Sequence, residues 1–139
     1  MKNKKILVVF LLGLILLLSA VIYFCRNTSM LPLDTEHATY ICFYNYPQYE
    51  SNYSVTDDAS VQEIVRAINS LNIQDGTKRA EKMSENYYYF TIHILKKDIS
   101  VELDENIISV SNENYQADTS VLRTLLEQII SDVKLGKIE

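Results

Sequence analysis

The sequence predicts an α+β protein in which an N-terminal transmembrane helix precedes an antiparallel sheet of four or five strands, with two helices packed on one face. Residues 6–25 are almost wholly apolar and carry no charge, as expected of a membrane helix. Residues 40–46 are rich in aromatic and β-branched side chains, and apolar and polar residues alternate over much of 88–110, both typical of strands. Two later segments have helical periodicity. The expected order is β-β-α-β-β-β-α after the anchor.

The anchor is the uncharged run from Ile6 to Cys25. Its twenty residues, at about 1.5 Å per residue, form a helix of about 30 Å, the thickness of the hydrocarbon core of a bilayer. Three lysines precede the run within residues 1–5, and only Arg26 follows it closely. Because basic residues next to a membrane helix tend to stay in the cytoplasm, we expect a cytoplasmic N-terminus and a single-pass protein of the cell membrane whose folded domain is extracellular.

A cleaved signal peptide is the alternative for this segment, and it would make the protein secreted. The run is longer than the ~7–15 apolar residues usual in signal peptides, and no pair of small residues closes it as a cleavage site would require. A disulfide between Cys25 and Cys42 is a second open alternative, since an extracytoplasmic location permits one. A small apolar role for Cys42 is favoured over that bridge.

Residues 26–37 lack periodicity and contain Pro32, so they are expected to form a stalk between the membrane and a domain spanning 38–139. A strand follows at 40–46, and a second at 53–55 is expected to pair with it as a hairpin. The first helix begins near Asp57, where Thr56, Asp57 and Asp58 offer N-cap oxygens. Its apolar stripe is Val61, Ile64, Val65, Ile68 and Leu71.

Residues 72–86 form a long polar connection, and an ordinary solvated loop is favoured over a binding site there. A meander of three strands is expected next, with turns at 96–98, 104–106 and 111–114. The last helix, capped by Asp118, Thr119 or Ser120, ends near Lys134 and Gly136, as a C-terminal charge and a glycine cap predict. Its stripe is Leu122, Leu125, Leu126, Ile129, Ile130 and Val133.

Strand alternation divides the sheet into two faces. The face toward the helices is predicted to contain Ile41, Phe43, Val55, Phe90, Ile92, Ile94, Ile99, Val101, Leu103, Ile108 and Val110. The opposite face then receives Tyr40, Cys42, Tyr44, Tyr46, Tyr87, Tyr89, Thr91, His93, Ser100 and Glu102. Tyrosine combines a rigid apolar ring with a hydroxyl group and is enriched at recognition sites.

We therefore take Tyr40, Tyr44, Tyr46, Tyr87, Tyr89 and His93 as candidate binding residues. The alternative is a plain sheet surface, because tyrosine is also common in exposed strands.

The charge of the chain restricts its partners. Residues 27–139 contain 9 basic and 18 acidic residues, a net charge of −9. Such a domain is repelled by phosphate backbones and by anionic lipid, which argues against nucleic acid as a partner. The expected partners are the membrane, through Ile6 to Cys25, and a protein at the cell surface.

Catalytic and metal signatures are weak. His93 has no Cys, Asp or Glu at a metal-binding spacing, and Ser84, Asp98 and Ser100 form no nucleophile motif. A phosphate-binding glycine loop is excluded because only Gly13, Gly76 and Gly136 are present. We expect a non-catalytic protein without a cofactor or metal. A small-ligand or enzymatic site around His93, and an immunity-type protein against a secreted toxin, are the alternatives.

The pattern of residues 38–135 resembles a family of small Firmicutes proteins, exported or membrane-anchored, that carry a domain of unknown function. The resemblance rests on the basic start, the apolar segment, the helix entry at 54–58 (SVTDD) and 64–71 (IVRAINSL), and the strand at 87–95 (YYYFTIHIL). It implies a Gram-positive cell-surface setting and brings no catalytic residues.

Overall fold

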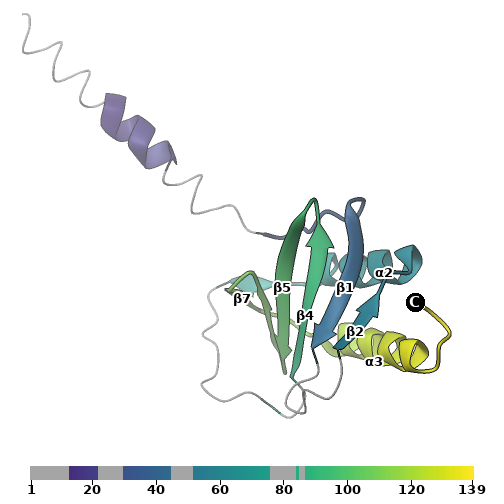
Figure 1. Cartoon of the computed structure of the whole chain (residues 1–139). Coiled ribbons are helices and arrows are strands. Elements are labelled where there is room, and N and C mark those ends of the chain that lie inside the picture. The colour runs from purple at the N-terminus through teal and green to yellow at the C-terminus, as the bar shows by residue number, and fades with distance from the viewer. Residues whose placement is uncertain (1–12, 22–29, 45–51, 76–83, 85–86) are drawn as a thin grey trace, which may run out of the picture.

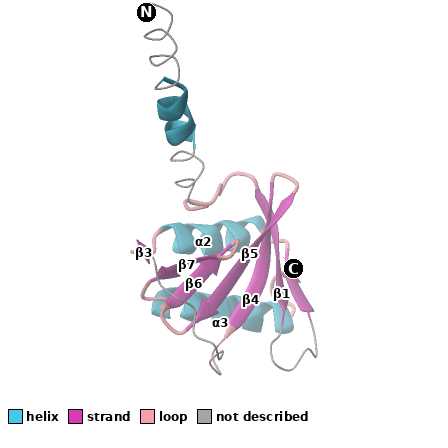
Figure 2. Ribbon diagram, turned by 90° about the vertical axis from the view of Figure 1, so that its left-hand side faces the viewer, coloured by secondary structure: helices cyan, strands magenta, loops and turns pink. Residues whose placement is uncertain are grey.

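The chain folds into an antiparallel sheet with two helices on one of its faces (Figures 1 and 2). The computed structural model describes residues 13–21, 30–44, 52–75, 84 and 87–139. The elements are β1 (Ala38–Tyr44), β2 (Asn52–Val55), α2 (Asp58–Asn69), β3 (Gln74–Asp75), β4 (Tyr88–Ile94), β5 (Lys97–Asp104), β6 (Ile107–Val110), β7 (Glu113–Gln116) and α3 (Ser120–Lys134). The predicted α+β class and antiparallel sheet are confirmed.

The sheet has seven strands in the order β2-β1-β4-β5-β6-β7-β3, so the predicted count of four or five was too low. The predicted β1–β2 hairpin is confirmed, with Ile41 opposite Val55. Two strands were missed. β7 occupies part of the expected 111–114 turn, and the two-residue β3 lies in the expected 72–86 loop and pairs with β7.

Tight turns join β4 to β5 and β6 to β7. Leu95 and Lys96 connect β4 to β5, and Ser111 and Asn112 connect β6 to β7, all four with φ between 48° and 70°. Positive φ at both central residues matches the right-handed twist of the flanking strands. The turn between β4 and β5 is therefore at 95–96 and not at 96–98, which places Asp98 within β5.

The core lies between the sheet and the helices, as Figure 2 shows. Every strand residue predicted to face the helices is buried, and Phe43 and Phe90 pair with ring centroids 5.2 Å apart. From the helices, the buried apolar residues are Val61, Ile64, Val65, Ile68, Leu122, Leu126 and Ile129. The burial of this apolar surface is the main favourable term in folding, and the predicted face assignment of the strands is confirmed.

The sequence indicated residues that mark the start of α2 and the end of α3. Asp57 is the N-cap of α2, and its carboxylate accepts hydrogen bonds from the Ser60 N–H at 2.8 Å and the Ser60 hydroxyl at 2.7 Å. These bonds lower the pKa of Asp57 because they stabilise the ionised form. At the other end of the domain, Gly136 adopts a φ of +66° just after α3, the conformation that favours glycine at a helix C-terminus.

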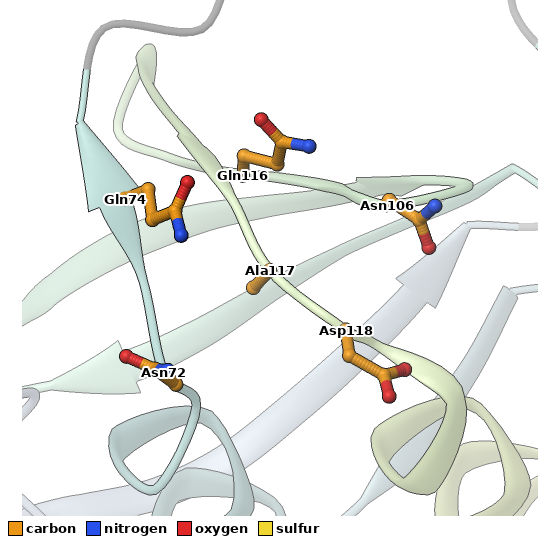
Figure 3. Close-up of a pocket in the computed structure, with 6 residues that line it drawn as sticks. All are labelled: Asn72, Gln74, Asn106, Gln116, Ala117 and Asp118. Atoms are coloured by element: carbon orange, nitrogen blue, oxygen red, sulfur yellow. The ribbon is translucent and has the colours of Figure 1, made fainter.

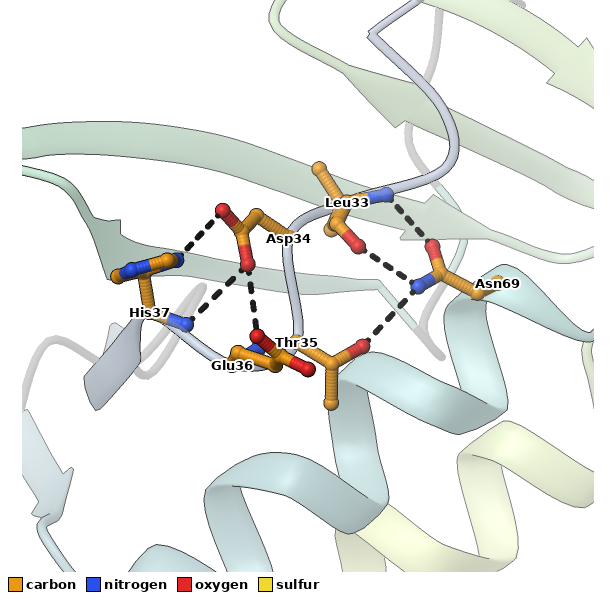
Figure 4. A network of polar contacts seen from close by, with 6 residues as sticks. All are labelled: Leu33, Asp34, Thr35, Glu36, His37 and Asn69. Carbon is orange, nitrogen blue, oxygen red and sulfur yellow. Dashed lines mark hydrogen bonds and ion pairs between the residues drawn. The ribbon is translucent and has the colours of Figure 1, made fainter.

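The segment before β1 packs against α2. Leu33 is buried, its N–H donates to the Asn69 side-chain oxygen at 2.7 Å, and its carbonyl accepts from the Asn69 amide at 2.9 Å (Figure 4). The Asp34 carboxylate accepts from the N–H groups of Glu36 and His37. The expected stalk spans 26–37, of which 26–29 lie outside the described residues. The part from Leu31 onward packs on the domain.

The segment after α3 returns to the start of α2. Ile138 packs against the core, and the Glu139 carbonyl oxygen accepts hydrogen bonds from the backbone N–H groups of Thr56 at 2.7 Å and Asp57 at 2.8 Å. The C-terminal segment is therefore held against the start of α2, more than 80 residues earlier in the chain.

Within the predicted anchor, residues 13–21 are helical and their side chains are exposed. A helix with the length and apolar character that a membrane span requires is not found among the described residues. The remaining parts of the predicted anchor, 6–12 and 22–25, lie outside them.

Candidate functional site

The candidate site is the sheet face that the helices leave uncovered, here called the open face. Strand pairing places Tyr40 opposite His93 and Tyr44 opposite Tyr89 on β1 and β4. On β5, Glu102 lies opposite Tyr89. Of the candidate binding residues, Tyr40, Tyr44, Tyr87, Tyr89 and His93 lie on described segments of the chain, whereas Tyr46 falls outside the described residues. None of the five is buried.

At one end of the open face, Tyr40, His93 and Asp98 form a row across three strands. The rings of Tyr40 and His93 stack, with centroids 4.6 Å apart and an angle of 7° between the planes. The Nδ1 atom of His93 lies 2.7 Å from the Asp98 carboxylate. Asp98 therefore fixes the orientation of the imidazole ring at its edge, and Tyr40 covers one face of that ring.

Sequence reasoning did not connect Asp98 with His93. The turn between β4 and β5 was predicted at 96–98, one residue too late. That prediction placed Asp98 in the turn and not in β5. With Leu95 and Lys96 as the two turn residues, Ile94 pairs with Lys97 and His93 with Asp98. The signal was available in the spacing of five residues, because a two-residue hairpin turn brings such positions opposite each other.

At the other end of the open face, three tyrosines gather near Glu102. The rings of Tyr44 and Tyr89 lie 5.2 Å apart at an angle of 35°, within the range of favourable aromatic pairs. The Tyr87 hydroxyl donates to the Glu102 carboxylate at 2.8 Å. The Tyr44 side chain remains the most open, with the residue 37% exposed.

Between the two ends lies a row of small side chains, with Cys42 flanked by Ser54 on β2 and Thr91 on β4. Cys42 is a free thiol in the described part of the chain, and Cys25, its suggested disulfide partner, lies outside that part. Burial, with the nearby charge of Asp98, raises the pKa of the Cys42 thiol. The thiol is therefore protonated at neutral pH, which is the unreactive form.

The charge of the open face is acidic. Asp98 and Glu102 project from β5 on this side, and Lys97 is the single Lys or Arg in the seven described strands. Lys97 lies opposite Ile94, whose side of the sheet faces the helices. Burial, with Asp98 as a further cause, raises the pKa of Tyr40, so its phenol stays neutral and able to donate a hydrogen bond.

The described residues of the open face form a surface for contact with a partner and lack the features of a metal site or a small-molecule cavity. No group of three or more His, Cys, Asp or Glu side chains suited to holding a metal ion occurs among the residues that could be searched, which are the described ones. A cavity beside Tyr44 and Tyr89 has a volume of about 50 Å³, whereas small-molecule sites usually have about 300–1,000 Å³.

Comparisons of the chain with protein-family models, with curated proteins and with solved structures found no match. The resemblance to a Firmicutes family therefore stays a prediction, and no family is identified.

Proposed function

We propose that this protein is a non-catalytic interaction module, anchored in the cell membrane by one N-terminal helix, that binds a protein partner through the open face of its extracytoplasmic domain. The observation that carries this proposal is the set of paired aromatic rings on the sheet face that α2 and α3 leave uncovered. Tyr40 stacks on His93, and Tyr44 and Tyr89 form a tilted pair. Rings held by neighbouring side chains lose little conformational freedom when a partner binds, which favours affinity.

The partner that fits this face is a basic protein segment. Asp98 and Glu102 supply negative charge on the same face as the tyrosines, and the region 27–139 has a net charge of −9. Lysine and arginine side chains bind carboxylates and also the faces of tyrosine rings. Complementary charge further steers the encounter and raises the association rate.

The apolar N-terminal segment supports the membrane part of the proposal. Leu14, Ile15, Leu16, Leu17, Leu18 and Val21 are each more than half exposed. Apolar side chains in this number are stable only when another apolar medium covers them. The Ser19 hydroxyl donates to the Ile15 carbonyl at 2.7 Å, which satisfies the polar group inside the helix itself, as a lipid environment requires.

A site for chemistry at His93 is the second candidate, and the His93–Asp98 contact favours it. A carboxylate that orients a histidine is part of many general-base sites. A base of this kind needs a nucleophile or a bound ligand beside it, and the raised pKa of Cys42 keeps the thiol on the open face in its unreactive form. Binding is therefore the better supported function.

The test is site-specific photocrosslinking on intact cells. A photoreactive amino acid replaces Tyr44, or, as the matched control, Val121, an apolar residue of α3 that is 77% exposed. We expect one protein to be crosslinked from position 44 and not from 121, through a segment rich in Lys and Arg. The double variant Asp98→Asn, Glu102→Gln should reduce the yield while the protein stays folded.

Protease treatment of the same cells tests the orientation, and extracellular protease should digest the domain. Crosslinks of equal yield from positions 44 and 121 would refute the binding face, and a protected domain would refute the orientation. A product-forming activity that His93→Ala removes without loss of folding would replace the binding proposal with the second candidate.

A further inference from the structure

A polar pocket lies at the edge of the sheet that is far from β1, beside β7 and the edge strand β3. Its volume is about 530 Å³, within the usual size of small-molecule sites. The lining consists of Asn72, Gln74, Asn106, Gln116, Ala117 and Asp118 (Figure 3). Five of the six residues are polar.

Three segments that are distant in the sequence, at 72–74, 106 and 116–118, build the pocket. Gln74 on β3 lies opposite Gln116 on β7, which sets their side chains on one side of the sheet. The Ala117 N–H donates to the Asn106 carbonyl at 2.9 Å, so the β5–β6 turn is held against the chain that follows β7. Asn72 lies just after α2 and Asp118 just before α3.

The chemistry of the lining is four carboxamides and one carboxylate. Each carboxamide offers an NH₂ donor and a carbonyl acceptor. Asp118 uses one carboxylate oxygen to accept from the Ser120 N–H at 3.0 Å, and hydrogen bonding to Ser120 lowers its pKa. The Asp118 carboxylate is thus ionised at neutral pH. Among the described residues, the four carboxamides form no side-chain hydrogen bond with the protein, so they are available to a ligand.

These groups select among ligand classes. An anion is disfavoured because the described residues of the lining include a carboxylate and no Lys or Arg. An apolar or flat aromatic ligand is disfavoured because Ala117 is the one apolar residue among these described lining residues. A neutral ligand with several hydroxyl groups fits, since each hydroxyl both donates and accepts as a carboxamide does.

We propose that the pocket formed by Asn72, Gln74, Asn106, Gln116 and Asp118 binds a neutral saccharide. The pocket is separate from the open-face tyrosines, so this inference does not depend on the proposed protein partner. Removal of two carboxamides that contact the ligand weakens binding about tenfold, because the loss of each hydrogen bond lowers the affinity about threefold.

The experiment is an NMR titration of the full-length ¹⁵N-labelled protein in phosphocholine micelles, which avoid the sugar headgroup of maltoside detergents. D-glucose and N-acetylglucosamine are the probes, and the side-chain NH₂ signals of Asn72, Gln74, Asn106 and Gln116 are the readout. We expect saturable shifts of these signals with at least one probe. The double variant Gln74→Ala, Gln116→Ala should weaken binding about tenfold by backbone signals near Asp118.

Gln128→Ala is the matched control, because Gln128 is an exposed amide on α3 outside the pocket. It should bind as the parent does, and the dispersion of the spectrum reports that each variant is folded. Absence of saturable shifts with both saccharides overturns the proposal. Equal affinity of the folded double variant overturns it as well, and so does saturable binding of inorganic phosphate or spermine in place of a saccharide.

Discussion

At the scale of the residue, single polar side chains hold segments that have no regular structure of their own. Asn69 is the main example, because its carboxamide pairs with both backbone groups of Leu33. Asp57 has another role, because it caps the start of α2 and accepts two hydrogen bonds from Ser60. The sequence pattern indicated this cap, whereas it did not specify the contact of Asn69 with Leu33.

Asn69→Ala should lower the free energy of unfolding by about 1–3 kcal/mol, because it leaves the partly buried Leu33 groups without their partner. Urea denaturation of the parent and the variant measures the difference. Asn72→Ala is the control, since Asn72 is an exposed amide of the same connection. Equal losses for the two variants would contradict the structural role given to Asn69.

Asp57→Ala should lower the urea midpoint at neutral pH, whereas Asp57→Asn should retain most of the stability because asparagine is an equally good N-cap. The pKa of Asp57 is lowered in the folded state. Its charged form therefore adds stability above the unfolded pKa of about 3.9, and this part is lost as the pH falls through the folded pKa. The parent and Asp57→Ala should converge in stability on acidification, and a constant difference down to the most acidic pH would contradict this.

The candidate site was predictable at this scale only in part. The alternation of apolar and polar residues predicted the face of the tyrosines, because each tyrosine lies next to a strand residue that was predicted to be buried. The Asp98 contact depended on a turn register that was wrong by one residue. The polar pocket escaped prediction because carboxamides form no motif, and its residues are far apart in the sequence.

At the scale of the element, strong periodicity was predictive and weak periodicity was not. The strands β1, β4, β5 and β6 have apolar residues at every second position, and both helices have a clear apolar stripe. β7 has a single buried residue, Tyr115, and β3 has two polar residues. Short polar strands at a sheet edge give no alternation to detect, because pairing with a neighbour determines them.

The β6–β7 hairpin provides a test of the tight turns. Asn112 has a φ of +70°, a conformation that a β-branched residue adopts at a cost of about 1–2 kcal/mol. Asn112→Val should therefore reduce stability by about that amount, whereas Asn112→Gly should be neutral or slightly stabilising. Thermal unfolding by circular dichroism compares the two. Equal stability of both variants would show that the turn does not require a left-handed residue.

At the scale of the whole molecule, the C-terminal segment of the domain is held against the start of α2. Deletion of residues 137–139 removes two backbone hydrogen bonds to Thr56 and Asp57 and the packing of Ile138. The expected loss is about 2–4 kcal/mol, from roughly 1 kcal/mol for each hydrogen bond and a similar amount for the partly buried side chain. Urea denaturation measures it, with Lys137→Ala as the control that keeps the backbone contacts. Full stability of the truncated chain would show that this contact is not needed.

The contact between Leu33 and Asn69 has a mechanical consequence if the chain is tethered through its N-terminal segment. A pull from the N-terminal side is opposed at Leu33 by the Asn69 carboxamide of α2, before tension reaches β1. β1 has hydrogen-bonded neighbours on both sides, β2 and β4. A force along β1 must break its hydrogen bonds to β2 and to β4 at the same time. The domain is therefore arranged to resist tension by shear, and its strands are not peeled one by one from an edge.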